Sequence, residues 1–395
     1  MQLSDVKQWI EQRKPQIETA LKTLVEINTH TVNRRGVDKG MDMLANITQD
    51  IGFPVETING RHRLIKAKKG QGKPRILLIS HMDTVFPPEE NFLHYEDLGD
   101  GFVNGPGVGD IKGGLVMGLW AMQAICELCS DYDVQMVISA DEENGSPTIR
   151  DWYLAGNVNA DYAIGLEPGF PQGELTPTVP LGVVYHRRGY GAIRFVVHGK
   201  ASHSGTPQLG LSAIEAMAQR ITRLHQLSDP SRNISVNVGL VQGGISPNTV
   251  AGTAQATVSF RYETQAHGEE TRAAIESIIQ GTYVHNEEIN LSDSVEMQVE
   301  AFIPPMESSD QSQAIVDIVL EEATRLGHNV VPIRRGGGSD ANYISAGGTS
   351  SICGMGAPAQ GIHTTSEKIY LPMLFERIEL LTATIYRLIN DNPGA

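Results

Sequence analysis

The sequence predicts an α/β fold in which a domain with a mostly parallel sheet carries an inserted α+β domain. Apolar strands alternate with helices towards both ends of the chain, as in parallel sheets whose two faces are covered. In the middle, polar and apolar residues alternate instead, as in half-buried antiparallel strands. At 395 residues the chain is also too long for one ordinary core. We therefore expect a discontinuous domain over residues 1–186 and 299–395 and an inserted domain over residues 187–298.

The elements expected in the discontinuous domain follow from helical periodicity and from short apolar runs. Helices are expected over residues 4–27, with a break at Pro15, and over residues 39–50, 112–129, 311–326 and 371–390. Strands are expected over residues 54–58, 62–66, 74–80, 134–140, 162–166 and 350–354. Two glycine-containing stretches, residues 97–110 and 336–340, are expected to be loops.

The inserted domain is expected to contain two helices and four strands. The pattern changes near Tyr185, after which polar and apolar residues alternate. Strands are expected over residues 191–198, 253–262 and 295–302, and helices over residues 211–227 and 268–283.

The composition is that of a globular protein, with 40% hydrophobic and 19% charged residues and a net charge of −15. This charge argues against nucleic acid or an anionic membrane as a partner, because both require a positive footprint. No apolar run is long enough for a membrane span, and the first residues contain no secretory segment. Cys126 and Cys129 could serve redox or zinc chemistry, but their helical apolar surroundings favour packing in a core. We expect a cytoplasmic protein.

One apolar run, residues 74–80, leads into a histidine and an aspartate. His81 and Asp83 are two residues apart, so on a strand both side chains leave the same face. A neutral imidazole is a good zinc ligand, and a carboxylate behind it would fix its tautomer and raise its basicity. The alternative is a histidine that is merely hydrogen-bonded at a strand end, since single His-x-Asp pairs are common.

Carboxylates and a second histidine follow other predicted strands or lie in loops. In open α/β sheets, ligands bind beyond the carboxyl ends of the strands. The further candidates are Asp110, Glu142, Glu143, Glu167 and His363. Each carboxylate alone could be a solvated loop acid, but together they favour a site with mixed nitrogen and oxygen ligands, which suits Zn²⁺. A bridging aspartate with two further ligands per metal would hold two zinc ions about 3.5–4 Å apart.

The glycine-rich loop GPGVGDIKGG, residues 105–114, does not match a nucleotide-binding loop. Asp110 replaces the third glycine of a dinucleotide fingerprint, and the loop does not follow an apolar strand. No Gly-Lys-Ser/Thr follows at the spacing of a phosphate loop, and an acidic residue would repel phosphate. A carboxylate among glycines is better suited to bridging metals at close backbone approach.

Glu142 and Glu143 are neighbours in ADEENGS, residues 140–146. On an extended chain their side chains would point apart. One could then bind a metal while the other faces the substrate as a general base.

These motifs resemble the aminoacylase/glutamate-carboxypeptidase family of co-catalytic di-zinc metallopeptidases, and within it they are most similar to the carboxypeptidase G group. The similar blocks span residues 80–369 in the family's order. They are SHMDTVFP, GPGVGDIKGG, ADEENGS, GLEPG, GKASHSG, GLVQGGISPNTV, SFRY, GGGSDAN and GIHTTSEKI. The resemblance implies a zinc-exopeptidase catalytic domain into which a lid and dimerisation domain is inserted.

The resemblance also implies a cofactor of two Zn²⁺ ions, for which Co²⁺ or Mn²⁺ could substitute. The implied ligands are His81 and Glu167 for one ion and Glu143 and His363 for the other. Asp110 would bridge the two ions, with a cis peptide bond to Ile111.

Two further residues of the catalytic domain receive roles from the resemblance. Asp83 would support His81 from behind. Glu142 would be the general base that takes a proton from water and returns it to the leaving nitrogen of an amide.

The inserted domain resembles the family's lid, through which two copies would form a homodimer. His203, in GKASHSG, would reach into the partner subunit's site and stabilise the oxyanion. Asn248 and Arg261 would hold the terminal carboxylate of the substrate, for which a guanidinium fork is suited. Gly337 and its neighbouring glycines would lie close to bound substrate. Without the resemblance, His203 would be a turn histidine and Arg261 a solvated strand residue.

Arg334 and Arg335, which precede the glycines, do not match the folate-cleaving enzymes of the carboxypeptidase G group. They either contact a substrate side chain or are solvated. The identity of the substrate therefore does not follow from the resemblance.

The leading hypothesis is a zinc exopeptidase that releases a C-terminal amino acid, such as glutamate, from a peptidyl or N-acyl substrate. A close alternative is an N-acyl-amino-acid deacylase that uses the same metals. An alternative of another class is a non-catalytic metal-binding scaffold, which is disfavoured because Glu142 and every implied ligand are present. The expected partners are a small peptide or N-acyl amino acid and a second copy of the chain.

Overall fold

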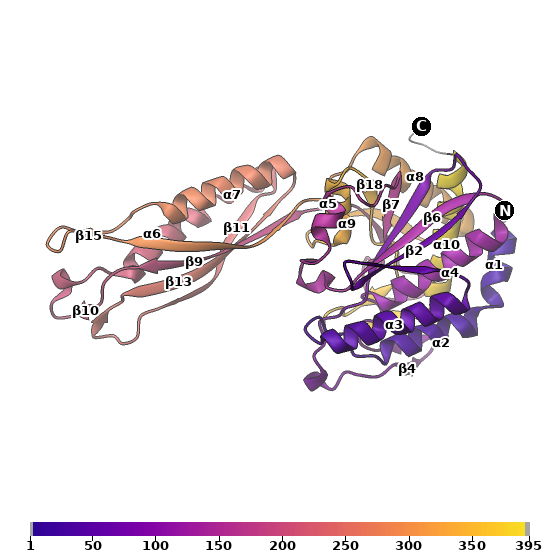
Figure 1. Ribbon diagram of the computed structural model, residues 1–395, viewed down its shortest axis with the longest axis horizontal. Helices are drawn as coiled ribbons and strands as arrows, with labels where there is room; N and C mark the ends of the chain where they lie inside the picture. Colours follow the sequence, from indigo (N-terminus) through magenta and orange to yellow (C-terminus); the bar gives the residue numbers. More distant parts are fainter. Residues whose placement is uncertain (1–2, 392–395) are drawn as a thin grey trace. The chain divides into compact units, whose positions relative to one another are not determined.

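The structure is a computed structural model that describes residues 3–391 of the chain. These residues fold into two compact units (Figure 1). The first unit consists of the described residues up to His186 together with Ser308–Arg335 and the residues from Ser339 onwards, and the second consists of Arg187–Glu307 and Gly336–Gly338. Each unit has its own hydrophobic core.

A six-stranded sheet lies at the centre of the first unit. Its strands are β1 (Val55–Ile58), β2 (His62–Lys69), β3 (Arg75–His81), β6 (Tyr132–Ser139), β7 (Tyr162–Gly165) and β18 (Ser350–Ile352). The order is β1-β2-β6-β3-β7-β18, in which β6, β3, β7 and β18 are parallel and β1 and β2 are antiparallel at one edge. Successive residues of β3, β6 and β7 are buried although they point to opposite faces, so both faces of the sheet are covered.

Helices pack on this sheet and on one another. They are α1 (Leu3–Glu11), α2 (Lys14–Val25), α3 (Arg34–Asp50), α4 (Lys112–Leu128), α5 (Arg150–Leu154), α8 (Asp310–Leu326), α9 (Asp340–Ala346) and α10 (Leu371–Asp391). α4 is buried over nearly its whole length, because it packs on β3 and β6 and also contacts α2 and α10. α9 contacts β3, β7 and β18. The start of α4 is therefore held in the core of the unit.

Smaller sheets complete the first unit. Their strands are β4 (Glu96–Gly99), β5 (Phe102–Asn104), β8 (Leu181–Arg187), β17 (Val330–Arg335), β19 (Ala359–Gln360) and β20 (Lys368–Tyr370). One sheet has the order β19-β20-β5-β4, and β17 pairs with β8. The pairing of β20 with β5 brings the loop after β19 close to the chain that leads into α4.

The second unit is built on a four-stranded antiparallel sheet with the order β11-β13-β9-β16. Its elements are β9 (Gly189–His198), β10 (Ser202–His203), α6 (Ala213–His225), β11 (Ser235–Gly243), β12 (Thr249–Val250), β13 (Thr253–Tyr262), α7 (Gln265–Gln280), β14 (His285–Asn286), β15 (Leu291–Ser292) and β16 (Ser294–Ile303). Burial alternates along β13, and α6 and α7 both pack against β9 and β13. One face of this sheet therefore forms the core of the unit.

The predicted α/β class, with a mostly parallel sheet and an antiparallel insertion, is confirmed. Several boundaries were wrong. Residues 97–110 are not all loop, because β4 and β5 form a hairpin there. The insertion does not end at residue 298, because the pairing of β16 with β9 continues to Ile303, opposite Tyr190. The helix predicted over residues 39–50 begins already at Arg34, where the side chain of Asn33 accepts a hydrogen bond from the backbone of Gly36.

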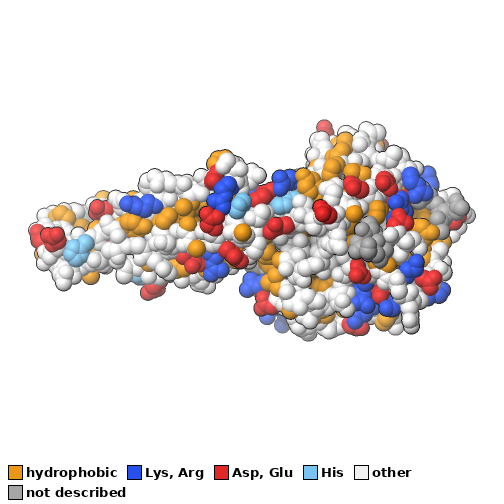
Figure 2. Space-filling model, turned by 90° about the horizontal axis from the view of Figure 1, so that it is seen from above, with side chains coloured by type: hydrophobic (Ala, Val, Ile, Leu, Met, Phe, Trp, Pro, Cys, Tyr) orange, Lys and Arg blue, Asp and Glu red, His pale blue; other side chains and the backbone are white. Residues whose placement is uncertain are grey.

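Among the helices of residues 3–391, none combines the length and hydrophobicity that a membrane span requires. Figure 2 shows acidic and basic side chains interspersed over the visible face of the molecule.

Candidate metal centre and active site

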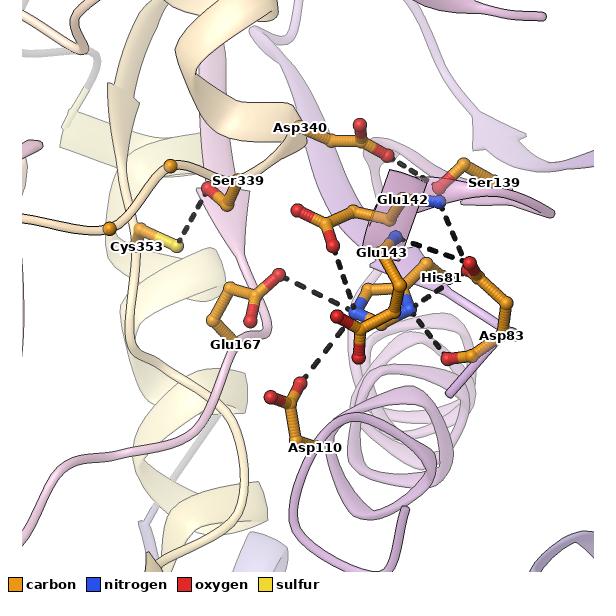
Figure 3. A network of polar contacts seen from close by, with 12 residues as sticks. His81, Asp83, Asp110, Ser139, Glu142, Glu143, Glu167, Ser339, Asp340 and Cys353 are labelled. Carbon is orange, nitrogen blue, oxygen red and sulfur yellow. Dashed lines mark hydrogen bonds and ion pairs between the residues drawn. The ribbon is translucent and has the colours of Figure 1, made fainter. Parts of the chain in front are cut away.

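Three parallel strands deliver the first group of candidate residues to one edge of the central sheet. His81 is the last residue of β3 and lies opposite Ser139 in β6, and Ile79 lies opposite Gly165 in β7. The chain therefore leaves β6 towards Glu142 and Glu143 and leaves β7 towards Glu167 at the level of His81. Figure 3 shows these side chains gathered around the imidazole.

Asp110 and His363 reach the same place from two loops. Asp110 lies just before α4, and the peptide bond between Asp110 and Ile111 is cis, as the resemblance implied. His363 lies between β19 and β20 in the left-handed backbone region. Its Nε2 atom is 3.1 Å from Asp110 Oδ2 and 3.5 Å from Glu143 Oε2. On the other side of Asp110, His81 Nε2 is 3.6 Å from Asp110 Oδ1 and 3.7 Å from Glu167 Oε1.

The five predicted ligands thus form two groups that share Asp110. One group is His81, Asp110 and Glu167, and the other is Asp110, Glu143 and His363. In each group the potential ligand atoms lie within 4.8 Å of one another. Two imidazoles and three carboxylates are hard and borderline donors, a set that suits Zn²⁺ and related divalent cations.

The electrostatics of the two groups also fit bound cations. The atoms His81 Nε2, Asp110 Oδ1 and Glu143 Oε1 are buried and have no hydrogen-bond partner. Uncompensated burial of such atoms is costly, and a cation placed among them would compensate them all. Burial opposes protonation of His81, yet its contacts with Asp110 and Asp83 raise the pKa of its imidazole well above the ordinary value. The contact with Asp110 likewise raises the pKa of His363 to about 10. The site therefore strongly favours positive charge.

Glu142 lies beside the two groups without belonging to either. Its Oε2 atom is 3.8 Å from His81 Nε2. Burial raises the pKa of Glu142 well above the usual range, and the neighbouring carboxylates of Glu167 and Glu143 add to this effect against the charge of His81. The expectation of an extended chain at this point was wrong, because Glu142–Asn144 form a turn of 3₁₀ helix. The two glutamates still approach different partners, His81 and His363.

Asp83 holds this arrangement from behind. Its carboxylate is fully buried and lies 3.2 Å from His81 Nδ1. It accepts hydrogen bonds from the backbone N–H groups of Glu142 and Glu143 over 3.0 and 3.1 Å, and from the hydroxyl of Thr31 over 2.8 Å. One carboxylate therefore fixes both an imidazole and the turn that carries two glutamates.

Glu367 was not among the predicted site residues, yet it is fully buried next to the site. Its Oε1 atom accepts hydrogen bonds from the backbone N–H groups of Gly109 and Asp110 over 2.8 and 3.0 Å. Burial raises its pKa to about 8. In the sequence, the only indication of this role was that Glu367 lies four residues after His363, in the block GIHTTSEKI.

Asp340 was also missed. Its buried carboxylate accepts a hydrogen bond from the hydroxyl of Ser139, at the end of β6 (Figure 3). It accepts another from the hydroxyl of Ser146, after the turn of Glu142. The hydroxyl of Tyr153 lies 3.3 Å from the same carboxylate. Asp340 therefore holds the chain in place on both sides of Glu142 and Glu143. In the sequence, the only indication of this role was an acidic residue in the block GGGSDAN.

The other predicted residues lie in the second unit. His203 is exposed on β10, and the pairing of β10 with β12 places it beside Asn248, whose carbonyl accepts a hydrogen bond from the N–H of Ser204 over 2.9 Å. Arg261 donates to the carbonyl of Gly336 over 2.6 Å, and the carbonyl of Gly337 accepts a hydrogen bond from Arg187 over 3.0 Å. The structure thus places His203 near Asn248, and Arg261 near the glycine stretch that contains Gly337.

Arg335, in β17, stacks its guanidinium on the ring of Phe170 at 3.8 Å. A cation–π contact of this kind accounts for the residue without a substrate. Arg334 precedes it on the same strand and is also exposed.

Comparisons with known proteins agree with this geometry. The model of peptidase family M20/M25/M40 matches residues 77–387. Carboxypeptidase G2 from Pseudomonas sp. (strain RS-16) is 26% identical over 89% of this chain and 84% of its own length. Succinyl-diaminopimelate desuccinylase from Psychromonas ingrahamii is 24% identical over 93% of this chain and 97% of its own. The crystal structure of aminopeptidase PepT from Bacillus cereus has a TM-score of 0.75, at 22% identity over 94% of this chain and 98% of that one. The predicted resemblance is confirmed, and the chain belongs to peptidase family M20/M25/M40.

Proposed function

We propose that this chain is a metal-dependent exopeptidase that hydrolyses an amide bond and releases a C-terminal amino acid, such as glutamate, from a peptidyl or N-acyl substrate. The observation that carries the proposal is the pair of ligand groups that share Asp110, with the carboxylate of Glu142 beside them. A site with one metal would not need the second histidine and the second glutamate at these distances.

In this proposal His81 and Glu167 would hold one metal ion and Glu143 and His363 would hold the other, with Asp110 as the ligand that the two groups share. Zn²⁺ is the favoured ion, with Co²⁺ or Mn²⁺ as substitutes. When bound, such ions act as Lewis acids and lower the pKa of water. Asp83 keeps His81 in the tautomer that presents Nε2 to the metal.

Glu142 is the general base in this proposal. It is close to the ligands without being needed as one, and its burial keeps its proton affinity high. It takes a proton from the attacking water and returns it to the nitrogen of the leaving amino acid. Support from Asp83 and Asp340 fixes the turn on which Glu142 is carried.

The second unit supplies substrate contacts in this proposal. His203 stabilises the oxyanion in the partner subunit's site, and its exposed position on β10 is compatible with that role. Asn248 and Arg261 hold the terminal carboxylate of the substrate, for which a guanidinium is suited. Gly337 lies close to the substrate, and a Cβ atom added there would meet no atom within 4 Å.

The proposed homodimer would form through the second unit. β11 is an edge strand of the four-stranded sheet. Leu240, Val241 and Ile245 on and after this strand are 70%, 56% and 91% exposed. Edge strands with exposed apolar side chains are apt to pair with another chain.

A second candidate is an N-acyl-amino-acid deacylase, which the similarity to a desuccinylase favours. The two candidates share metals and base and differ in the acyl group. The metal-binding scaffold is the weaker alternative, because Glu142 lies in place beside both ligand groups.

A substrate panel tests these proposals. The zinc-loaded protein is incubated with acyl-glutamates, acyl-alanines, dipeptides and the same compounds with amidated C-termini, before and after removal of metal with a chelator. We expect hydrolysis of compounds with a free carboxylate only, and its loss with the metal. Glu142→Gln should bind metal normally but lose about 10²–10⁴-fold in kcat. Failure of the loaded protein to hydrolyse any carboxylate-bearing amide would contradict both enzymatic candidates.

A further inference from the structure

A cavity of about 550 Å³ lies within the first unit, lined by α1, the start of α2, the turn between α8 and β17, residues 177–181 and the first turns of α10. None of the residues in the two ligand groups lines it. We call it the α1–α10 cavity. The proposed reaction assigns no task to it.

Arg377, on α10, is a buried cation in the wall of this cavity. It is 2% exposed, and it donates to the carbonyls of Gly354 and Gly356 over 2.6 and 3.4 Å. Its Nη1 atom is buried and has no partner. Within residues 3–391 no carboxylate lies within 4.0 Å of this guanidinium, although buried cations are ordinarily paired. Burial lowers its pKa to about 10, so the group stays charged at neutral pH.

His328, in the turn between α8 and β17, presents a second unpartnered nitrogen. Its Nδ1 atom is buried without a hydrogen-bond partner, and its Nε2 atom is 4.0 Å from Glu379 Oε2. Burial lowers the pKa of His328 to about 4, and the positive charges of Arg377 and Lys7 contribute to this. Two cationic side chains, from α1 and α10, and the neutral imidazole of the turn therefore line one cavity.

The acidic groups of the cavity limit what can enter it. Glu11 is paired with Lys14 over 2.5 Å, while Glu376 and Glu379 lie on α10 on either side of Arg377. An extended polyanion would meet these carboxylates. A small ligand with one compact anionic group could instead contact the guanidinium, while any ammonium group that it carried would face a glutamate.

We propose that the α1–α10 cavity binds a small carboxylate- or phosphate-bearing molecule, which the charges of Lys7 and Arg377 attract. Its anionic group reaches the buried atoms Arg377 Nη1 and His328 Nδ1 when the side chains that cover them move aside. This binding does not depend on the proposed hydrolysis. The cavity nevertheless adjoins the site's scaffold, because the N–H of Gly356 donates to the carbonyl of Glu167 over 2.9 Å. Arg377 and Glu167 therefore hold the same short segment of chain.

Calorimetric titration of the metal-loaded protein tests the proposal, with acetate, inorganic phosphate and glutamate as probes at constant ionic strength. We expect saturable binding of a carboxylate or of phosphate, and the three probes distinguish the two chemistries. Lys7→Ala and His328→Gln should each weaken that binding about tenfold. Lys39→Ala likewise removes an exposed positive charge, from α3 and outside the cavity, and should leave the binding unchanged.

The same variants distinguish binding in the cavity from binding of a probe at the candidate metal site. None of them changes a predicted metal-binding residue or Glu142, so a probe bound at that site would keep its affinity. Equal affinity in wild type, Lys7→Ala and His328→Gln would overturn the proposal, as would the absence of binding by all three probes. Arg377→Lys keeps the charge but loses the fork and should also bind more weakly. If Arg377→Lys does not fold, the other two variants still decide the outcome.

Discussion

Glu367 accepts a hydrogen bond from the backbone N–H of Asp110 over 3.0 Å, and through it the loop that carries His363 is fastened to the loop that carries the shared carboxylate. The same oxygen also accepts the N–H of Gly109. Two loops far apart in the chain are thereby fixed at one carboxyl group. Such support is what a site with closely spaced ligands requires.

Glu367→Ala should weaken metal binding about 10–100-fold, because the backbone before Asp110 loses its acceptor. Glu367→Gln should remain within a few-fold of wild type, since an amide oxygen accepts the same two N–H groups and a pKa of about 8 leaves the native carboxyl largely neutral at pH 7. Competition with a chelator of known affinity measures both. Equal metal affinity of the alanine and glutamine variants would show that this hydrogen bond does not support the site.

Asp83→Asn should reduce metal affinity about 10–100-fold, because it removes the negative charge beside His81 Nδ1 and one of the acceptors for the turn of Glu142. Thr31→Val removes only the hydroxyl donor to Asp83 and should have a smaller effect. Metal content and dissociation constants give the measurement. A larger loss of metal affinity in Thr31→Val than in Asp83→Asn would contradict this role of Asp83.

Asp340 predicts a pH dependence of stability. Burial raises its pKa to about 6, so between about pH 4 and pH 6 the folded protein keeps a proton that the unfolded chain has released. The tighter proton binding of the folded state therefore stabilises the protein fully at low pH. As the pH rises through this window, the free energy of unfolding falls by at most roughly 3 kcal/mol. Asp340→Asn cannot titrate, so its stability relative to wild type should increase from pH 4 to pH 7.

Urea unfolding of both proteins across this range measures the difference, and Asp97→Asn, on the exposed strand β4, serves as the control with no expected change. A constant difference between wild type and Asp340→Asn would mean that the pKa of Asp340 is the same in the folded and the unfolded protein, and would contradict this prediction.

Leu240→Lys should dissociate the proposed homodimer, because it places a charge on the exposed edge strand β11. Leu98→Lys makes the same change at an exposed leucine of the first unit and should leave the assembly intact. Sedimentation velocity distinguishes the two. A wild-type protein that is monomeric at all concentrations would remove the dimer and, with it, any role of His203 in a partner subunit.

Four of the residues that the structure brings together at the candidate site were predictable, because each one follows an apolar run that the sequence reveals. His81, Glu142, Glu143 and Glu167 come after apolar runs, and parallel strands bring their carboxyl ends to one edge. The antiparallel insertion was likewise predictable from the alternation in β9 and β13.

The supporting acids were not predictable in the same way. Glu367 and the N–H of Gly109 are 258 residues apart, and their contact depends on the pairing of β20 with β5, short strands without a clear pattern. Asp340 needs hydroxyls from the ends of two other segments. An acid with no periodic surroundings looks like any solvated loop residue until its partners are known.

The three glycines at residues 336–338 belong to the second unit, while the residues on both sides of them belong to the first. A recombinant fragment spanning only residues 187–307 would lack the carbonyl groups that Arg187 and Arg261 bind. Conversely, a protein from which residues 187–307 were deleted would keep the three glycines but lose the guanidinium groups of Arg187 and Arg261 that donate to them. A recombinant version of the second unit should therefore include the three glycines, joined to residues 187–307 by a linker. The boundaries of the folded unit do not coincide with a single continuous stretch of the sequence.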